Sequence, residues 1–152
     1  MIEPAARAEP PRAPETAAAP PAWLDAALSW PLLTQAPLRS QHLGRAHLAE
    51  LRVSPEAVGA YRSLTPDTEL PPGSFFVEWL RDAESGRPGP IFALERAPEG
   101  WRFWVLDARG QPEPGGAPGL CAGCHAGAPA PPLFGLPREG LESTAPVPRS
   151  PE

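Results

Sequence analysis

Lysine is absent from this sequence of 152 residues, and cysteine, methionine and tyrosine are scarce, with two, one and one residues. All 13 basic residues are therefore arginines, scattered singly, and the net charge is -5. A chain of this charge offers no attractive field to phosphates, so nucleic acid is not expected as a partner. No apolar run approaches the roughly 20 residues that cross a bilayer, and the N-terminus lacks the basic and apolar regions of a signal peptide. No transmembrane segment is expected.

Proline, in contrast, is abundant, and the 25 prolines are concentrated at the two ends and in loops. Segments of this composition bury too little apolar surface to fold. Residues 1–22 are therefore predicted to form a disordered tether rich in alanine and proline, and residues 138–152 a disordered tail. The part between them, residues 23–137, is predicted to be a single folded domain, as the length of the chain suggests.

The spacing of apolar residues in the folded part predicts short helices and several strands. A first helix is expected over residues 23–33, where Pro31 should end or kink it. A second is expected over residues 54–63, with Ser54 at the N-cap and Pro55 at the first helical position. Strands are predicted for residues 45–53, 74–81, 90–95 and 101–107. The expected fold class is α+β and mainly β, with an antiparallel sheet of four to five strands and a few short helices.

The segment Cys121-Ala122-Gly123-Cys124-His125 has the C-x-x-C-H signature of c-type haem attachment. In a helical turn, residues i, i+3 and i+4 share one face, so both thiols can reach the two vinyl groups of a haem while the imidazole lies under the iron. The motif contains both cysteines of the chain and one of its three histidines. We therefore expect one covalent haem c on a C-terminal helical turn, bound through Cys121 and Cys124, with His125 as the proximal iron ligand.

Three other roles for the two cysteines remain open. A zinc site would require four tetrahedral ligands, which would have to include His42 or His47 beside the adjacent pair Cys124 and His125. A thioredoxin-like redox couple would be expected in a βαβ unit, which the surrounding pattern does not suggest. An inert disulfide would suit a small secreted domain.

The far side of the haem iron has few candidate ligands in this sequence. Met1 is the sole methionine and lysine is absent, which disfavours a small electron carrier with a methionine sulfur on the iron. The iron is then either five-coordinate or paired with His47 or, less strongly suggested, with His42. We favour the open site, which would bind or transform a small molecule such as nitric oxide or hydroxylamine.

Four parts of the chain occur in an order that resembles a known protein family. They are residues 45–61, residues 73–82, residues 100–107, and the C-x-x-C-H motif followed by Leu133-Phe134. In this order they resemble the cytochrome P-460 family and its relative cytochrome c prime beta. The resemblance implies a mainly β domain, often a homodimer, with a single haem whose proximal ligand matches His125. It also implies the binding of nitric oxide or the oxidation of hydroxylamine.

One feature of the family is replaced in this chain. In the cytochrome P-460 enzymes, the strand that residues 73–80 resemble carries a lysine cross-linked to the haem, and the matching residue here is Glu78. A carboxylate cannot form that cross-link, so the chain more closely resembles the uncross-linked c prime beta type, whose distal face is crowded by apolar side chains. Glu78 is then a candidate distal base, with a solvent-facing glutamate as the alternative.

Three more residues are candidates for the distal side of the haem. Phe76 and Leu80 share the strand face of Glu78 and could form a distal wall against the cofactor, with ordinary core packing as the alternative. His47 is a candidate distal iron ligand, because its strand resembles the family segment with a distal arginine, although the arginine position itself matches Ala49. A purely structural histidine is the alternative.

The expected function is therefore that of a c-type cytochrome whose covalent haem binds nitric oxide or a related small ligand. An oxidoreductase that oxidises hydroxylamine or nitric oxide is one alternative, although the loss of the lysine favours binding over catalysis. A cytochrome with two histidine ligands that exchanges electrons with a partner protein is another. Because covalent haem attachment is normally carried out outside the cytoplasm, we expect a periplasmic or other extracytoplasmic location, with an export signal that is not present in this chain.

Overall fold

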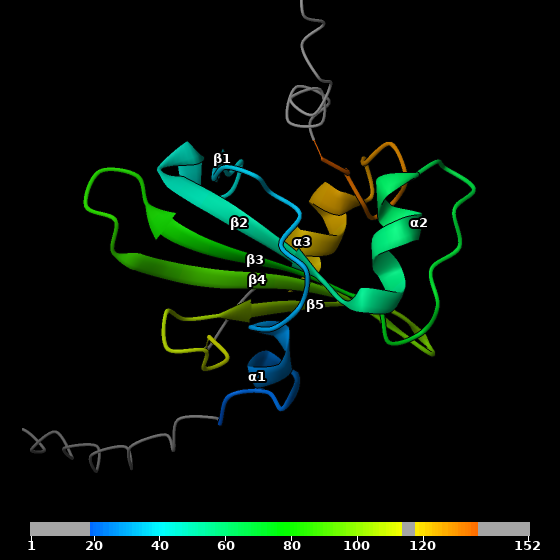
Figure 1. The fold of residues 1–152 in the computed structure, drawn as a ribbon, viewed down its shortest axis with the longest axis horizontal. Coiled ribbons are helices and arrows are strands. Elements are labelled where there is room, and N and C mark those ends of the chain that lie inside the picture. The colour runs from blue at the N-terminus through cyan, green and yellow to red at the C-terminus, as the bar shows by residue number, and fades with distance from the viewer. Residues whose placement is uncertain (1–18, 114–117, 137–152) are drawn as a thin grey trace, which may run out of the picture.

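The computed structural model of the protein describes residues 19–113 and 118–136, and a five-stranded antiparallel sheet lies at its centre (Figure 1). The strands are β1 (Leu38–Arg39), β2 (His47–Val53), β3 (Phe75–Asp82), β4 (Pro88–Ala97) and β5 (Gly100–Leu106). They lie in the sheet in the order in which they occur along the chain. This confirms the expected mainly β fold of the α+β class. The predicted tails, apart from residues 19–22, lie outside the described residues.

Short helices lie on both faces of the sheet. Helix α1 (Trp23–Ala27) lies on one face, while α2 (Val58–Arg62) and α3 (Pro118–His125) lie on the other (Figure 1). Single 3-10 turns occur at Leu43–Arg45 and Pro55–Ala57. In the part of the chain that the structure describes, no helix has the length and apolar character needed to span a membrane.

Each face of the sheet has its own buried cluster, because successive side chains of a strand point to opposite faces. On the face of α2, Val53, Phe76 and Leu94 are register partners on neighbouring strands and pack with Ala57 and Tyr61. The cluster on the face of α1 consists of Ala27, Val77, Ile91, Ala93 and Leu106. The cysteine and histidine motif of α3 therefore lies on the same side of the sheet as the first cluster.

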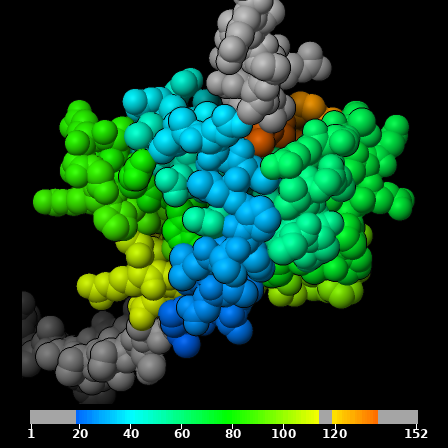
Figure 2. All heavy atoms as spheres, in the orientation of Figure 1, coloured from blue at the N-terminus to red at the C-terminus, as the bar shows by residue number. Residues whose placement is uncertain are grey.

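Between α1 and β1, the chain crosses the edge of the sheet beside β2. The N–H of Val53 donates to the carbonyl of Pro31 at 3.1 Å, and the N–H of Leu33 donates to the carbonyl of Leu51 at 2.8 Å. Figure 2 shows this segment in blue, passing over the surface of the molecule. These bonds satisfy edge groups of β2 that would otherwise lack a partner. The segment also carries the chain to the loop after β1, where His42 lies.

The first helix is shorter than the predicted range 23–33 and ends at Ala27. Beyond it, Ser29 donates both its N–H, at 3.1 Å, and its hydroxyl, at 2.8 Å, to the carbonyl of Ala26. This tight turn competes with further helical hydrogen bonds. Pro31 also disfavours helical backbone at the residue before it. The helix therefore ends before the proline is reached.

Three of the four predicted strands match β2, β3 and β5 closely. Strand β4 is longer than the predicted residues 90–95, and it is the strand that pairs with β3 on one side and β5 on the other. Pairing on both sides extends a strand beyond the run of residues whose own pattern favours it. The two residues of β1 are too few to show any alternation in the sequence.

The turn before β2 has an unusual backbone. Leu43, Gly44 and Arg45 have φ angles of 51°, 66° and 65°, in the left-handed region that residues other than glycine rarely adopt. The N–H of Arg45 donates to the carbonyl of His42 at 3.1 Å, and the guanidinium of Arg39 donates to the carbonyl of Arg45 at 2.8 Å. The strand predicted to begin at Arg45 therefore begins two residues later, and the turn fixes the position of His42.

Ser54 occupies the N-cap position that the sequence predicts, but its hydroxyl does not cap the helix. Its Oγ atom accepts a hydrogen bond from the N–H of Phe75 at 2.9 Å, and its own N–H donates to the carbonyl of Phe75 at 3.0 Å. The N-cap position is therefore confirmed, but the hydroxyl makes no capping bond, because the Phe75 N–H, distant in sequence, takes it. These two bonds hold the end of β2 to the start of β3.

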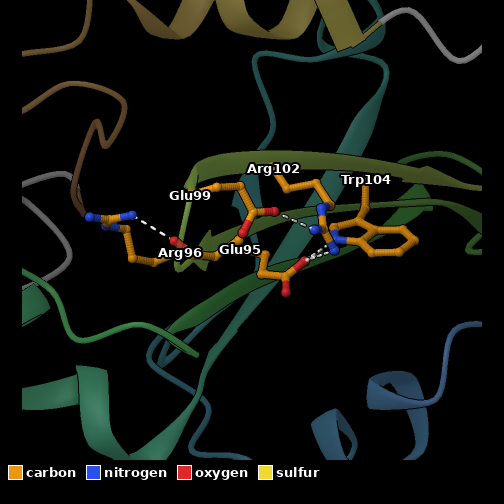
Figure 3. A network of polar contacts seen from close by, with 6 residues as sticks. Glu95, Arg96, Glu99, Arg102 and Trp104 are labelled. Carbon is orange, nitrogen blue, oxygen red and sulfur yellow. Dashed lines mark hydrogen bonds and ion pairs between the residues drawn. The ribbon is translucent and has the colours of Figure 1, made fainter.

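The hairpin of β4 and β5 carries a polar network on the face away from α2 and α3 (Figure 3). Arg102 donates to Glu95 at 3.2 Å and to Glu99 at 2.7 Å, and the indole N–H of Trp104 donates to Glu95 at 3.0 Å. The pKa of the Glu99 carboxyl is lowered, first by its own backbone N–H and then by Arg102. Exposed ion pairs of this kind stabilise a fold only slightly.

Candidate functional site

Helix α3 brings Cys121, Cys124 and His125 to one side of the molecule. None of the side chains that the structure describes in this helix is buried, and that of Leu120 is 78% exposed. The ring of His125 meets the rings of Phe103 and Phe134 edge to face, with centroid distances of 5.4 and 5.2 Å. A helix with so little buried surface gains little from its own packing. It is therefore suited to hold a group that covers it.

The hydrogen bonding of His125 determines which ring nitrogen is available. Its Nδ1 atom lies 2.7 Å from the carbonyl oxygen of Pro132. A carbonyl oxygen only accepts hydrogen bonds, so Nδ1 carries the hydrogen and Nε2 has the free lone pair. Metal-binding histidines are typically held in this way, with one nitrogen bound to a backbone carbonyl and the other on the metal.

A cavity of about 390 Å³ lies between α3, α2 and the sheet. Its lining includes Cys121, Cys124 and His125 from α3, Tyr61 from α2, Phe76 and Glu78 from β3, Phe92 from β4, Phe103 from β5, and Ser40 and His42 from the loop after β1. Most of the lining is apolar, with a few polar side chains. Both its volume and its character are typical of a cofactor pocket.

The structure brings some of the predicted distal residues to this cavity and leaves others outside it. Phe76 and Glu78 line it together with all three residues of the motif, whereas Leu80 and His47 do not. Leu80 is buried in the sheet opposite Ala49. His47 lies at the far end of β2 opposite Asp82, and its buried Nδ1 atom has no hydrogen-bond partner among the described residues.

His42, the less favoured histidine in the sequence, is the one that lies in the cavity. Its ring is stacked on Phe92 with a centroid distance of 4.3 Å, and its centroid is 6.3 Å from that of His125. Its Nδ1 atom lies 3.1 Å from Oγ of Ser40 and 2.9 Å from Oε2 of Glu78. The local sequence around His42 has no periodicity that could have predicted this position.

Glu78 is the acidic side chain of the cavity wall, which Arg39 also lines. Despite the short distance to His42, the direction is not that of a hydrogen bond, and the buried Oε2 atom has no hydrogen-bond partner within the described residues. Such an atom loses its hydration without full compensation. Burial, and to a smaller degree the carboxylate of Glu78, raises the pKa of the neighbouring Tyr61 phenol. Tyr61 is thus a neutral hydroxyl beside the cavity.

The two cysteines are free thiols, so the disulfide alternative is not formed in this structure. Burial raises the pKa of the Cys121 thiol, whereas a redox-active cysteine is typically a stabilised thiolate with a lowered pKa. In residues 19–113 and 118–136, no three His, Cys, Asp or Glu side chains are grouped closely enough to hold a metal ion. A structural zinc site needs four such ligands, while a haem brings its own four equatorial nitrogens and needs one or two from the protein.

The residues of the cavity therefore fit a haem better than they fit the other groups considered. The sequence matches no protein-family model and no curated protein. The assignment of a function consequently depends on the residues of the site themselves.

Proposed function

We propose that this protein is a c-type cytochrome with one covalent haem, which binds nitric oxide or a related small ligand on the face of the haem away from His125. The observation that carries the proposal is the convergence of Cys121, Cys124 and His125 on one largely apolar cavity, with Nδ1 of His125 held by the carbonyl of Pro132. The C-x-x-C-H spacing and the resemblance to the cytochrome P-460 family support the same function.

The side chains of the cavity have separable tasks in this proposal. Cys121 and Cys124 would form thioether bonds to the haem, and His125 would hold the iron through Nε2 while Pro132 fixes the ring. The bound haem supplies an iron that can take a small ligand and change its oxidation state. Phe92 and Phe103 would disfavour water beside the bound group, since both contribute apolar surface to the cavity.

Oxidation of hydroxylamine is a second candidate function, and the buried Oε2 atom of Glu78 favours it. A carboxylate without a hydrogen-bond partner inside a cavity is a suitable proton acceptor for a small substrate. The reaction would pass its electrons to a partner protein. Hydroxylamine-dependent reduction of an added electron acceptor, lost in Glu78→Gln, would support this function, and no reduction above the haem-free background would eliminate it.

The main proposal is tested by the linkage of pigment to protein. The full chain, produced in the periplasm of a host with a haem c maturation system, should keep its haem in acidified acetone. Cys121→Ala/Cys124→Ala should lose it. The reduced protein should then change its visible spectrum on addition of nitric oxide. Complete extraction of haem from the native sequence would disprove covalent attachment.

The location of the protein follows from the same chemistry. Thioether bonds between haem and a C-x-x-C-H motif are normally formed outside the cytoplasm, so we propose a periplasmic or other extracytoplasmic location. The absence of lysine and the net charge of -5 give no indication of attachment to an anionic membrane surface.

A further inference from the structure

The cavity contains a second imidazole that faces the proposed proximal ligand. His42 comes from the loop after β1, and His125 comes from α3, so the two rings belong to elements about 80 residues apart in the sequence, as their residue numbers show. Their planes differ by 21° and their centroids are 6.3 Å apart. No contact between the two side chains is needed to hold them there, because each is fixed by its own neighbours.

The distance between the two rings is compatible with one iron between them. An imidazole nitrogen binds a first-row metal at about 2.0 Å and lies roughly 1.1 Å from the centre of its own ring, so two rings on opposite sides of one metal have centres about 6 Å apart. The distance of 6.3 Å between the ring centroids of His42 and His125 agrees with this value. His47, in contrast, does not line the cavity.

The polar neighbours of His42 lie on the Nδ1 side of its ring. Nδ1 is 3.1 Å from Oγ of Ser40, which also accepts the backbone N–H of His42, and it is 2.9 Å from Oε2 of Glu78. A serine hydroxyl can donate or accept, so Ser40 is compatible with the tautomer that has its hydrogen on Nδ1 and its lone pair on Nε2. That tautomer is the one that binds a metal through Nε2. The stacking on Phe92 further restricts the ring.

We infer that His42 is the second protein ligand of the haem iron in the resting protein, oriented by Ser40 and by stacking on Phe92. This inference rests on the proposed function, since it requires the haem. It also adds a form of regulation: a small ligand reaches the iron only where His42 has left it. The apparent affinity for any such ligand is then lower than the intrinsic affinity by the fraction of protein in the open form.

The test compares three forms of the full haem-loaded chain by visible and electron paramagnetic resonance spectroscopy. The native protein should be six-coordinate and low-spin in both oxidation states. His42→Ala should be high-spin, and added imidazole should restore the low-spin spectrum. His47→Ala is the matched control and should keep the native spectrum. His42→Ala should also bind imidazole or nitric oxide about tenfold or more tightly than the native protein.

The outcomes separate this inference from the proposed function. A high-spin native protein that retains its haem in acidified acetone overturns the role of His42 and leaves the proposed function intact. A low-spin spectrum that persists in His42→Ala also overturns it. If His42→Ala does not accumulate, the native ferric signal decides, because two imidazole ligands give a low-spin signal and an open site gives a high-spin one. Loss of all haem from the native chain refutes the proposed function instead.

Discussion

At the scale of single residues, the packing of the sheet depends on side chains that are fully enclosed. Leu106, at the end of β5, has 0% exposure and packs with Ala27 of α1 and Val77 of β3. Leu106→Ala should lower the free energy of unfolding by about 2–5 kcal/mol, because it removes buried methyl groups and leaves a cavity. Urea denaturation of both proteins measures the change.

The control for this substitution is Leu28→Ala. Leu28 is 60% exposed, so the same chemical change should alter the free energy of unfolding by no more than about 0.5 kcal/mol. Equal losses in the two variants would show that Leu106 does not belong to a close-packed cluster.

The ionisation of Tyr61 can be followed without interference from other tyrosines, because it is the only tyrosine of the chain. Burial, and secondarily Glu78, raises the pKa of its phenol well above the ordinary value. Below a pH of about 10 the phenol is neutral in both the folded and the unfolded chain, so it adds no pH dependence to stability. Above that pH the unfolded chain loses its proton first, and the free energy of unfolding should fall by about 1.4 kcal/mol per pH unit until the folded phenol ionises.

The measurement is the tyrosinate absorbance of the native protein, taken as a difference against Tyr61→Phe to cancel the tryptophans and any haem. No tyrosinate should form near pH 10 while the far-ultraviolet circular dichroism remains native. If tyrosinate forms in the folded protein at the ordinary pKa of a phenol, Tyr61 is not buried as the structure has it.

At the scale of elements, the junction from β2 to the following helical turn depends on Ser54. Its Oγ atom is the hydrogen-bond acceptor of the Phe75 N–H, and Ser54 is almost fully buried. Ser54→Ala leaves that N–H without a partner and should cost about 1–3 kcal/mol of unfolding free energy. Chemical denaturation measures the loss.

Ser29→Ala is the matched control, since its hydroxyl bonds the Ala26 carbonyl at an exposed position. It should change the stability by no more than about 0.5 kcal/mol. A loss as small as this in Ser54→Ala would mean that water reaches the Phe75 N–H.

Strands could be predicted from the sequence where apolar and polar side chains alternate over enough residues. His47–Val53 and Gly100–Leu106 each present apolar side chains at every second position, and the structure forms β2 and β5 there. The length of β4 was not predictable, since its ends are extended by pairing with β3 and β5. Helix α1 was predicted too long, because the turn at Ser29 is a local competition that helical spacing does not reveal.

At the scale of the whole molecule, α3 is the element that most depends on the proposed haem. It lies on the sheet without a buried side chain among those described, while α1 and the turn before α2 contribute Ala27 and Ala57 to the two clusters. The double variant Cys121→Ala/Cys124→Ala, which cannot bind haem covalently, should therefore melt roughly 10 °C or more below the haem-loaded protein. Hydrogen exchange should be faster in α3 but little changed in β3.

Thermal denaturation followed by circular dichroism gives the first comparison, and exchange followed by mass spectrometry gives the second. Ala122→Ser is the control, because it alters an exposed residue of the same helix and keeps the motif. Identical melting temperatures for the double variant and the native chain would mean that α3 is held by packing alone.

The main strands could be predicted from the sequence alone, because apolar residues alternate along each of them. The proposed haem chemistry likewise comes from a short-range pattern, the motif Cys121 to His125 within one helical turn. The same alternation placed Phe76 and Glu78 on one face, and both line the cavity.

Which histidine faces His125 could not be predicted from the sequence. His42 and His47 are five positions apart, yet the left-handed turn at Leu43–Arg45 places one in the cavity and the other at the end of β2. Leu80 is likewise buried outside the cavity, at the point where the pairing of β3 with β4 shifts between Trp79 and Arg81. The physical reason is that a local pattern fixes the face on which a side chain lies, while its neighbours across the molecule depend on turns and strand pairing that form between distant residues.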